Sequence, residues 1–324
     1  MKALVFEEPR HAAVRDVDVP TIFADEVLVR SRNVGICHSD FELYEGRYII
    51  PVSYPIIPGH EWAGEIAEVG SGVATLRPGD RVVGECVVNG GDDHFGFSIS
   101  GADAEYFVAK ASWLHRIPDE LSFTQGAFVE PFSVAYSAAV AADGIDASDE
   151  VAVIGGGPIG LLCAMAAATM GGSVTLIEPQ GHRRALGLEV GASQAIDPYA
   201  GPLTEQVAEA TRGRGFDVVI EAAGAPAAMA SAFPIAALGG RVVLVGIDIG
   251  GTTGVEIGLV QSKALQVRGI IGSAGLWPRT IRFMATSGVD PTPLLTATFP
   301  LGDGAAALDA ARDTSRNIKV QLEC

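Results

Sequence analysis

Residues 151–160 read Val-Ala-Val-Ile-Gly-Gly-Gly-Pro-Ile-Gly, a short apolar strand followed by a glycine-rich turn. An apolar segment continues to Met170 and predicts a helix directly after the turn. The three spaced glycines match G-x-G-x-x-G in the strand–turn–helix context that makes this pattern informative. The first glycine permits the tight turn, the second lets a pyrophosphate approach the backbone, and the third lets helix and strand pack closely. The dinucleotide contacts are therefore expected from Gly155, Gly157, Pro158, Ile159 and Gly160.

An acidic residue ends the next predicted strand, residues 174–177. The carboxylate of Glu178 is placed to accept hydrogen bonds from an adenosine ribose and to repel a 2′-phosphate. NAD is therefore preferred over NADP. Arg183 is the counter-argument, because an arginine at this point can accommodate that phosphate.

Strands and helices alternate from residue 133 to residue 271. This alternation predicts a doubly wound parallel sheet with helices on both faces, a Rossmann-type α/β domain. Ligands of such sheets lie at the carboxyl ends of the strands. Further cofactor contacts are therefore expected from Ala223, Gly246 and Ile247.

Short β-branched strands broken by glycine and proline fill the first 109 residues. They predict a β-rich, barrel-like domain. The tail after residue 271 is too short for a domain of its own and is expected to return to the first one.

Composition excludes several classes of function. The chain has 324 residues, a formal net charge of −17 and a pI of about 4.7, which argues against nucleic acid and anionic membranes as partners. No apolar run reaches the ~18 residues of a membrane span. The four cysteines form no CxxC pair, and the N-terminus resembles a strand rather than a signal peptide, so a cytoplasmic location is expected.

Cys37 and His60 are the candidate metal ligands. A thiolate and an imidazole suit zinc, but 22 residues separate them, so only a fold could bring them together. A buried core cysteine and a hydrogen-bonded histidine would account equally well for these two residues alone.

A wider set of segments resembles one family, the zinc-dependent medium-chain alcohol and polyol dehydrogenases. In chain order they are residues 37–40 (Cys-His-Ser-Asp), 58–65 (Pro-Gly-His-Glu-Trp-Ala-Gly-Glu), 79–83 (Gly-Asp-Arg-Val-Val), 104–106 (Ala-Glu-Tyr), 130–131 (Glu-Pro), the glycine loop and 318–320 (Ile-Lys-Val). The Glu-Pro pair is typical of the branch that oxidises polyols, threonine and aminocyclitols. The resemblance implies a GroES-like catalytic domain at 1–132 and 272–324, with a Rossmann domain at 133–271.

The resemblance also assigns roles to single residues. Ser39 would receive the substrate proton, and Asp40 would orient the imidazole of a zinc ligand. Glu42 stands where many relatives carry a histidine at the surface end of the proton relay, so either Glu42 or water would take the proton onward. Lys319 aligns with a basic residue that contacts the pyrophosphate.

The third zinc ligand has two candidates. Glu61 follows His60, and Glu130 precedes Pro131; relatives carry both acids. Glu130 is favoured, directly or through water, with Glu61 as its close competitor. A zinc ion with three protein ligands and an open position would lower the pKa of a substrate hydroxyl, and the nicotinamide would accept the hydride.

One zinc ion per chain is expected, because Cys86 and His94 cannot by themselves complete the four-cysteine structural site of many relatives. The predicted function is NAD- and zinc-dependent oxidation of a secondary alcohol, such as a polyol, sugar alcohol or aminocyclitol, by a homo-oligomer, with a tetramer favoured over a dimer. The alternatives are a zinc-free NADPH-dependent quinone or enone reductase on the same fold and a non-catalytic nucleotide-binding protein.

Overall fold

The computed structural model describes residues 1–248, 250–273 and 275–324. They form two compact units. Unit 1 comprises Met1–Glu130, Trp277–Thr286 and Leu295–Cys324, and unit 2 comprises Pro131–Leu276 and Ser287–Leu294. The domain limits 132/133 and 271/272 stay a prediction.

Unit 2 contains the predicted doubly wound sheet. Its six strands are parallel, in the order β12-β11-β10-β13-β14-β15, so the order reverses between β10 and β13. The strands are β10 (Glu150–Ile154), β11 (Ser173–Ile177), β12 (Gln194–Ile196), β13 (Phe216–Glu221), β14 (Ala236–Leu244) and β15 (Gln266–Gly269).

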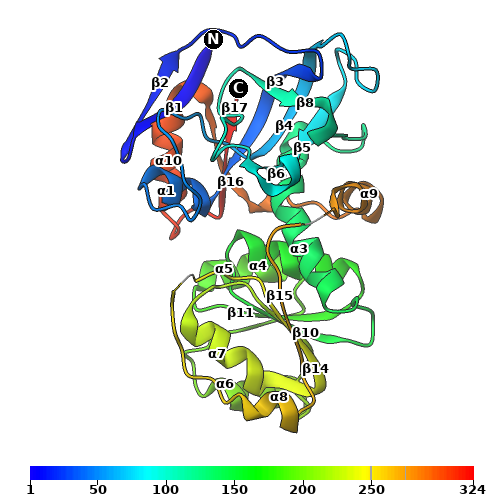
Figure 1. The fold of residues 1–324 in the computed structure, drawn as a ribbon. Helices are drawn as coiled ribbons and strands as arrows, with labels where there is room; N and C mark the ends of the chain where they lie inside the picture. Colours follow the sequence, from blue (N-terminus) through cyan, green and yellow to red (C-terminus); the bar gives the residue numbers. More distant parts are fainter. Residues whose placement is uncertain (249, 274) are drawn as a thin grey trace. The chain divides into compact units, whose positions relative to one another are not determined.

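Helices cover both faces of this sheet, with α4 and α5 on one face and α6, α7 and α8 on the other (Figure 1). They are α3 (Val129–Ala141), α4 (Pro158–Thr169), α5 (Gly181–Glu189), α6 (Leu203–Ala210), α7 (Pro226–Ile235) and α8 (Gly258–Ser262). The strands β10 and β13 are almost wholly buried, as expected for a parallel sheet packed on two sides.

Unit 1 is built on a seven-stranded sheet in the order β16-β17-β3-β4-β5-β9, with β8 paired to β3. The C-terminal strand β17 lies antiparallel to β3, beside the residues that precede Cys37. The strands of unit 1 are β1 (Lys2–Glu8), β2 (His11–Asp16), β3 (Glu26–Ile36), β4 (Glu61–Val69), β5 (Arg81–Gly84), β6 (Val87–Val88), β7 (Asp93–His94), β8 (Tyr106–Lys110), β9 (Leu114–Arg116), β16 (Leu295–Pro300) and β17 (Lys319–Glu323).

The helices of unit 1 are short. They are α1 (His38–Tyr44), α2 (Phe123–Gly126), α9 (Trp277–Ser287) and α10 (Gly304–Arg312), and 3-10 turns occur at Asn89–Gly91, Ala111–Trp113 and Leu301–Asp303. A further 3-10 turn, Thr292–Leu294, belongs to unit 2. None of the helices in the described ranges combines the length and apolar character that a membrane crossing needs.

Two local features were not predicted from the sequence. The segment after Cys37 is the helix α1, which a search for long apolar periods misses because α1 has only seven residues. Helix α7 ends at Ile235, and β14 begins at once with Ala236. Pro234 has no amide hydrogen to continue the helix, and Ala236 instead pairs with Phe216 of β13.

Candidate metal centre and cofactor loop

The pairing of β3 with β4 brings the candidate metal ligands together. Cys37 directly follows β3, and His60 directly precedes β4. The two strands are antiparallel, with Gly35 opposite Glu61, so the end of one strand meets the start of the other. One ligand atom from each of Cys37, His60 and Glu61 lies within 4.8 Å of the other two. Strand pairing thus brings together residues that 22 positions separate in the sequence.

Asp40 contacts both predicted ligands from the first turn of α1. Its Oδ2 accepts a hydrogen bond of 2.8 Å from the backbone N–H of Cys37, and its Oδ1 lies 3.3 Å from His60 Nδ1. Both side chains are buried. An imidazole whose Nδ1 faces a carboxylate presents Nε2 to a metal, and this arrangement is typical of zinc-binding histidines.

Ser39 lies on the other side of the same imidazole. Its Oγ is 3.4 Å from His60 Nε2, the nitrogen that a metal would take. The hydroxyl is therefore next to the donor cluster, as its predicted role in proton transfer requires. Glu42, the predicted outer end of the relay, pairs with Arg47 at 3.2 Å and with the exposed His38 at 3.9 Å.

The electrostatics of the cluster favour a cation. Burial disfavours a charged His60, but the carboxylate of Asp40 and the thiol of Cys37 outweigh this and raise the pKa of His60 well above its usual value. A metal ion can occupy the place that the additional proton takes on His60. The donor set of one thiol, one imidazole and one carboxylate fits zinc.

Glu61 is held by a lysine. Its Oε2 accepts a hydrogen bond of 2.5 Å from Lys319 Nζ, and both side chains are almost fully buried. A Cβ at Gly35 would stand 2.3 Å from Oε2 of Glu61, so a larger residue at position 35 would displace this carboxylate. The predicted contact of Lys319 with a pyrophosphate stays a prediction; in the structure its Nζ contacts the acid beside His60.

Glu130, the favoured third ligand, lies in the first turn of α3 and is half-buried. Burial raises its pKa to about 7; His60 opposes this increase, and the neighbouring Glu61 adds to it. Glu130 therefore interacts with the cluster, but the three donors that converge are Cys37, His60 and Glu61. The preference for Glu130 over Glu61 receives no support from this geometry.

Aromatic support for the cluster was missed in the sequence. The centroid of the Phe97 ring lies 4.6 Å from that of the His60 ring, and the Tyr48 ring stacks on Phe97 at 4.3 Å with nearly parallel planes. Phe97 is fully buried, so it fixes one face of the imidazole. Neighbouring aromatic residues in a glycine-rich loop were the only available signal, and it does not single out Phe97.

Asp103 is a second buried acid that the sequence did not reveal. It packs against the backbone at Gly59, and its Oδ1 has no hydrogen-bond partner among the described residues. Burial raises the pKa of Asp103 well above its usual value, and Asp40 adds to the effect.

Cys86 and His94 are the two residues considered above for a structural zinc site. The Cys86 thiol donates to the carbonyl of Phe95 at 3.6 Å, and burial raises its pKa to about 12. Cys86 is not among the donors that converge in the described residues. The count of one zinc per chain stays a prediction.

The glycine loop of unit 2 has the predicted strand–turn–helix context. Gly155 has a φ of +101°, which favours glycine, and Gly157 precedes α4 as its N-cap. A Cβ on Gly160 would lie 1.9 Å from the carbonyl oxygen of Gly155, whereas a Cβ on Gly157 would meet nothing within 4 Å. Gly160 is thus required by packing, and Gly157 leaves space over the helix N-terminus. Pro158 and Ile159 form the first turn of α4.

Glu178 is tied to this loop. Its Oε2 accepts a hydrogen bond of 2.6 Å from the N–H of Gly156, and its Oε1 one of 2.8 Å from the N–H of Gln180. Arg184 donates to the carbonyl oxygen of Glu178 and pairs with Asp197 at 3.0 Å, so its charge is already neutralised. Arg183 is the remaining nearby arginine, and its Cβ would lie 3.2 Å from a Cβ at Gly156.

The other predicted cofactor residues lie at the carboxyl edge of the same sheet. The N–H groups of Ala223 and Gly224 donate to Glu221 Oε1 at 2.9 and 3.0 Å, and the N–H of Gly246 donates to the Glu221 carbonyl at 3.0 Å. Ile247 is exposed. Ala223 follows β13, one of the two strands at the strand-order reversal, and Gly246 follows its neighbour β14. Such sheets bind ligands at this edge.

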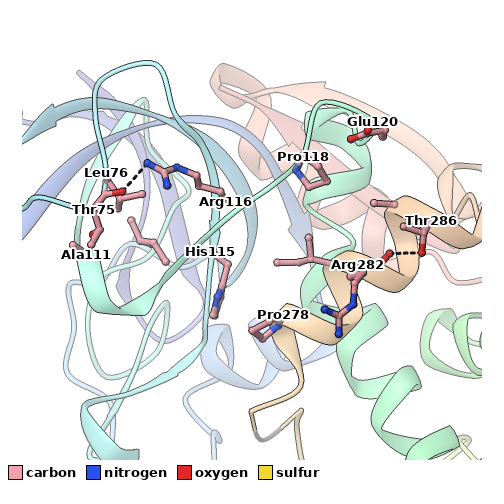
Figure 2. A pocket seen from close by; sticks show the side chains of 13 residues that line it. Thr75, Leu76, Ala111, His115, Arg116, Pro118, Glu120, Pro278, Arg282 and Thr286 are labelled. Atoms are coloured by element: carbon pink, nitrogen blue, oxygen red, sulfur yellow. Dashed lines mark hydrogen bonds between the residues drawn. The ribbon is translucent and has the colours of Figure 1, made fainter.

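A separate cavity of about 620 Å³ lies in unit 1, between the segment that includes Arg116 and the helix α9 (Figure 2). Arg116 pairs with Asp80 at 2.6 Å, and the lining also includes Arg282 and Glu120. None of the predicted site residues lines this cavity.

Segments of both units match known protein families. The family model described as "Alcohol dehydrogenase GroES-like domain" matches residues 24–119, and "Zinc-binding dehydrogenase" matches residues 158–286. The chain is 32% identical to sorbitol dehydrogenase of Bacillus subtilis (96% of this chain, 93% of that protein) and 31% identical to D-xylulose reductase of Morganella morganii (98% and 99%). A dehydrogenase from Sinorhizobium meliloti 1021, solved with NADP, superposes with a TM-score of 0.92 at 29% identity, over 100% of this chain and 99% of that one. The chain therefore belongs to the zinc-type medium-chain alcohol and polyol dehydrogenase family.

Proposed function

We propose that this oxidoreductase transfers a hydride between a secondary hydroxyl of a polyol or sugar alcohol and NAD, with one zinc ion held by Cys37, His60 and an acid. The observation that carries the proposal is the convergence of Cys37, His60 and Glu61 within 4.8 Å, with Ser39 beside His60. The activities named for the relatives, on sorbitol and on D-xylulose, supply the substrate class. A zinc-free reductase of this fold would have no use for such a donor set.

Several residues around the proposed metal site would each have a separate role in the reaction. Bound zinc would act as a Lewis acid that makes the substrate hydroxyl easier to ionise. Asp40 holds the Cys37 backbone and the His60 ring, so it fixes two ligands at once. Ser39 Oγ accepts the hydroxyl proton and passes it toward Glu42 or water. Phe97 prevents the imidazole from tilting.

The cofactor is held by the glycine loop and the neighbouring strand ends. Gly157 leaves the helix N-terminus open to the pyrophosphate, and the N-terminal end of α4 favours its negative charge. Glu178 selects NAD, because its carboxylate would accept hydrogen bonds from the ribose and repel a 2′-phosphate. The NADP in the Sinorhizobium structure makes this selection the part most in need of a test.

Three further expectations belong to the proposal: one zinc per chain, a cytoplasmic location, and a homo-oligomer with a tetramer favoured.

The experiment combines zinc analysis of purified protein with a panel of polyols, sugar alcohols and aminocyclitols followed by NADH absorbance. Wild-type protein is expected to hold about one zinc per chain and to oxidise members of the panel. Cys37→Ala is expected to lose both zinc and turnover while still binding NADH. Cys86→Ala is the matched control, because Cys86 is a half-buried thiol of the same unit outside the three-donor cluster. Retained turnover in Cys37→Ala, or equal zinc loss in Cys86→Ala, would reject the site.

Cofactor choice is tested with Glu178→Gln. The substitution keeps the size of the side chain and removes its charge, so NADP use is expected to rise while the KM for NAD increases about tenfold, the order expected for one charged hydrogen bond. An unchanged ratio of NAD to NADP efficiency would assign the choice to other residues, Arg183 first among them.

A further inference from the structure

The cavity beside α9 contains none of the residues used in the proposed chemistry. Its volume of about 620 Å³ lies within the range of roughly 300–1,000 Å³ that is typical of small-molecule sites. Three parts of the chain line it: residues 75–76 ahead of β5, the strand β9 with its flanking residues, and one face of α9 (Figure 2). All of the lining residues belong to unit 1, so this unit forms the cavity by itself.

The walls of the cavity are largely apolar. The apolar side chains come from Leu76 and Leu114 and, on α9, from Pro278, Ile281 and Ala285. Small-molecule sites combine such walls with a few polar groups that fix the orientation of the ligand. The polar groups of this cavity therefore indicate which ligand it suits.

Two polar groups of the lining are already occupied by other residues. Arg116 pairs with Asp80, through Nε at 3.0 Å and through a terminal nitrogen at 2.6 Å. The Nε2 of His115 lies 2.7 Å from an oxygen of Glu85. Neither side chain needs a ligand to satisfy it.

Arg282 of α9 differs from Arg116. It is exposed at the cavity, and within the part of the chain that the structure describes its guanidinium has no acidic partner. The chain as a whole has a net charge of −17, so an arginine without such a partner stands in a predominantly acidic protein. Its planar fork of N–H donors matches a carboxylate, which it can bind through two parallel hydrogen bonds.

Glu120 limits the charge that the ligand can carry. Figure 2 shows Glu120 near Thr286, toward the C-terminal end of α9, whereas Arg282 lies nearer to Pro278. A second negative group on the ligand would be repelled by Glu120. The lining therefore favours one carboxylate, at the Arg282 end, attached to an apolar body that packs on the walls.

We propose that this cavity is a binding site for a small monocarboxylate with an apolar body, and that Arg282 binds its carboxylate. The site is separate from the metal centre, because Cys37, His60 and Glu61 are absent from its lining. The inference goes beyond the proposed function and does not depend on it.

The test follows the binding of hexanoate to the purified full-length protein by saturation-transfer difference NMR, with hexanamide as the uncharged probe of the same length. The dissociation constant of hexanoate is expected on the order of 1 mM, which is reasonable for a ligand of this size. Arg282→Gln is expected to weaken hexanoate binding about tenfold, the scale of one hydrogen bond to a charged group. Binding of hexanamide is expected to be weaker in the wild type and unchanged by Arg282→Gln.

Three further variants locate the bound probe. Arg279→Gln is the matched control, because Arg279 lies on the same helix but does not line the cavity, and hexanoate is expected to bind it as it binds the wild type. Ala285→Phe places a ring in the cavity and is expected to abolish binding of both probes. Cys37→Ala is expected to bind hexanoate like the wild type, because the metal centre takes no part.

Several results would overturn the inference. They are no saturable binding of hexanoate at about ten times the expected dissociation constant, equal affinity for hexanoate and hexanamide in the wild type, or equal affinity of the wild type and Arg282→Gln for hexanoate. An equal loss in Arg279→Gln would reduce the effect to surface charge, and loss of binding in Cys37→Ala would move the probe to the metal centre. If Ala285→Phe does not fold, the comparison of Arg282→Gln with Arg279→Gln decides. Retained zinc and turnover in Cys37→Ala would reject the proposed function and leave this site unaffected.

Discussion

The strongest single test of the metal centre is Asp40→Asn. Asp40 offers two acceptor oxygens to two groups, the N–H of Cys37 at 2.8 Å and Nδ1 of His60 at 3.3 Å. Asparagine has nearly the same shape but only one acceptor oxygen, and its amide nitrogen is a donor. One of the two groups must therefore face another donor.

The two possible outcomes both weaken zinc binding. If the amide faces His60, the imidazole shifts its proton to Nε2 and loses the lone pair that a metal needs. If the amide faces Cys37, the backbone N–H that starts α1 loses its acceptor. Mutating a hydrogen-bond partner of a metal ligand typically lowers the metal affinity 10–100-fold, which corresponds to about 1.4–2.7 kcal/mol.

The assay is competition for zinc with a chromophoric chelator, run beside thermal unfolding of the metal-free protein. Asp103→Asn is the matched control: Asp103 is 4% exposed and Asp40 3%, and both lie near His60, but Asp103 Oδ1 has no hydrogen-bond partner in the described ranges. Asp103→Asn is expected to bind zinc like the wild type. Equal affinity in Asp40→Asn and wild type, or an equal loss in the two variants, would refute the assignment of Asp40.

Three further predictions test the remaining parts of the structure. Gly157→Ala is expected to leave the melting temperature unchanged and to weaken NADH binding measured by fluorescence. Gly160→Ala is expected to lower the melting temperature, because its Cβ would lie 1.9 Å from a carbonyl oxygen. The reverse pattern would contradict the roles given to the two glycines. Phe97→Ala removes a fully buried ring from the face of His60 and is expected to cost about 3–5 kcal/mol in urea unfolding, and a cost below about 1 kcal/mol would show that the ring is not packed as described. Asp103→Asn also predicts a pH effect. Burial raises the pKa of Asp103, so the folded wild type keeps a proton that the unfolded chain releases above about pH 4. The wild type then loses about 1.4 kcal/mol per pH unit from this group until its raised pKa is reached. The stability of Asp103→Asn relative to wild type should grow between pH 5 and pH 8 in metal-free protein, and a constant difference would show that the carboxyl is ionised in the folded state.

Much of the fold could be predicted because it depends on local patterns. The strand, glycine turn and apolar helix at 151–170 are consecutive in the sequence. In the structure, Gly155 has the positive φ and Gly160 the close backbone packing for which glycine was expected. Glu178 follows a recognisable strand and lies at the loop, as expected. Each of these features involves residues close to one another in the chain, or elements that simply alternate.

For the metal centre, the sequence identified some of the residues and only the structure identified the others. The chemistry of the side chains alone was enough to nominate Cys37 and His60, and the resemblance nominated Asp40 and Ser39. The sequence favoured Glu130 over Glu61 as the third ligand but could not decide between them, because both are acids beside informative residues. The register that sets Gly35 opposite Glu61 brings Glu61 into the converging set of three.

The sequence by itself determined the doubly wound sheet, the cofactor loop and the types of ligand, because these depend on periodicity, glycine stereochemistry and donor atoms. Only the tertiary structure placed Lys319 on Glu61 and Phe97 on His60. Lys319 and Glu61 are 258 positions apart. Their contact depends on β17 and β4 lying on either side of β3. The sequence around either side chain does not indicate how these strands pair, so the contact could not be predicted from it.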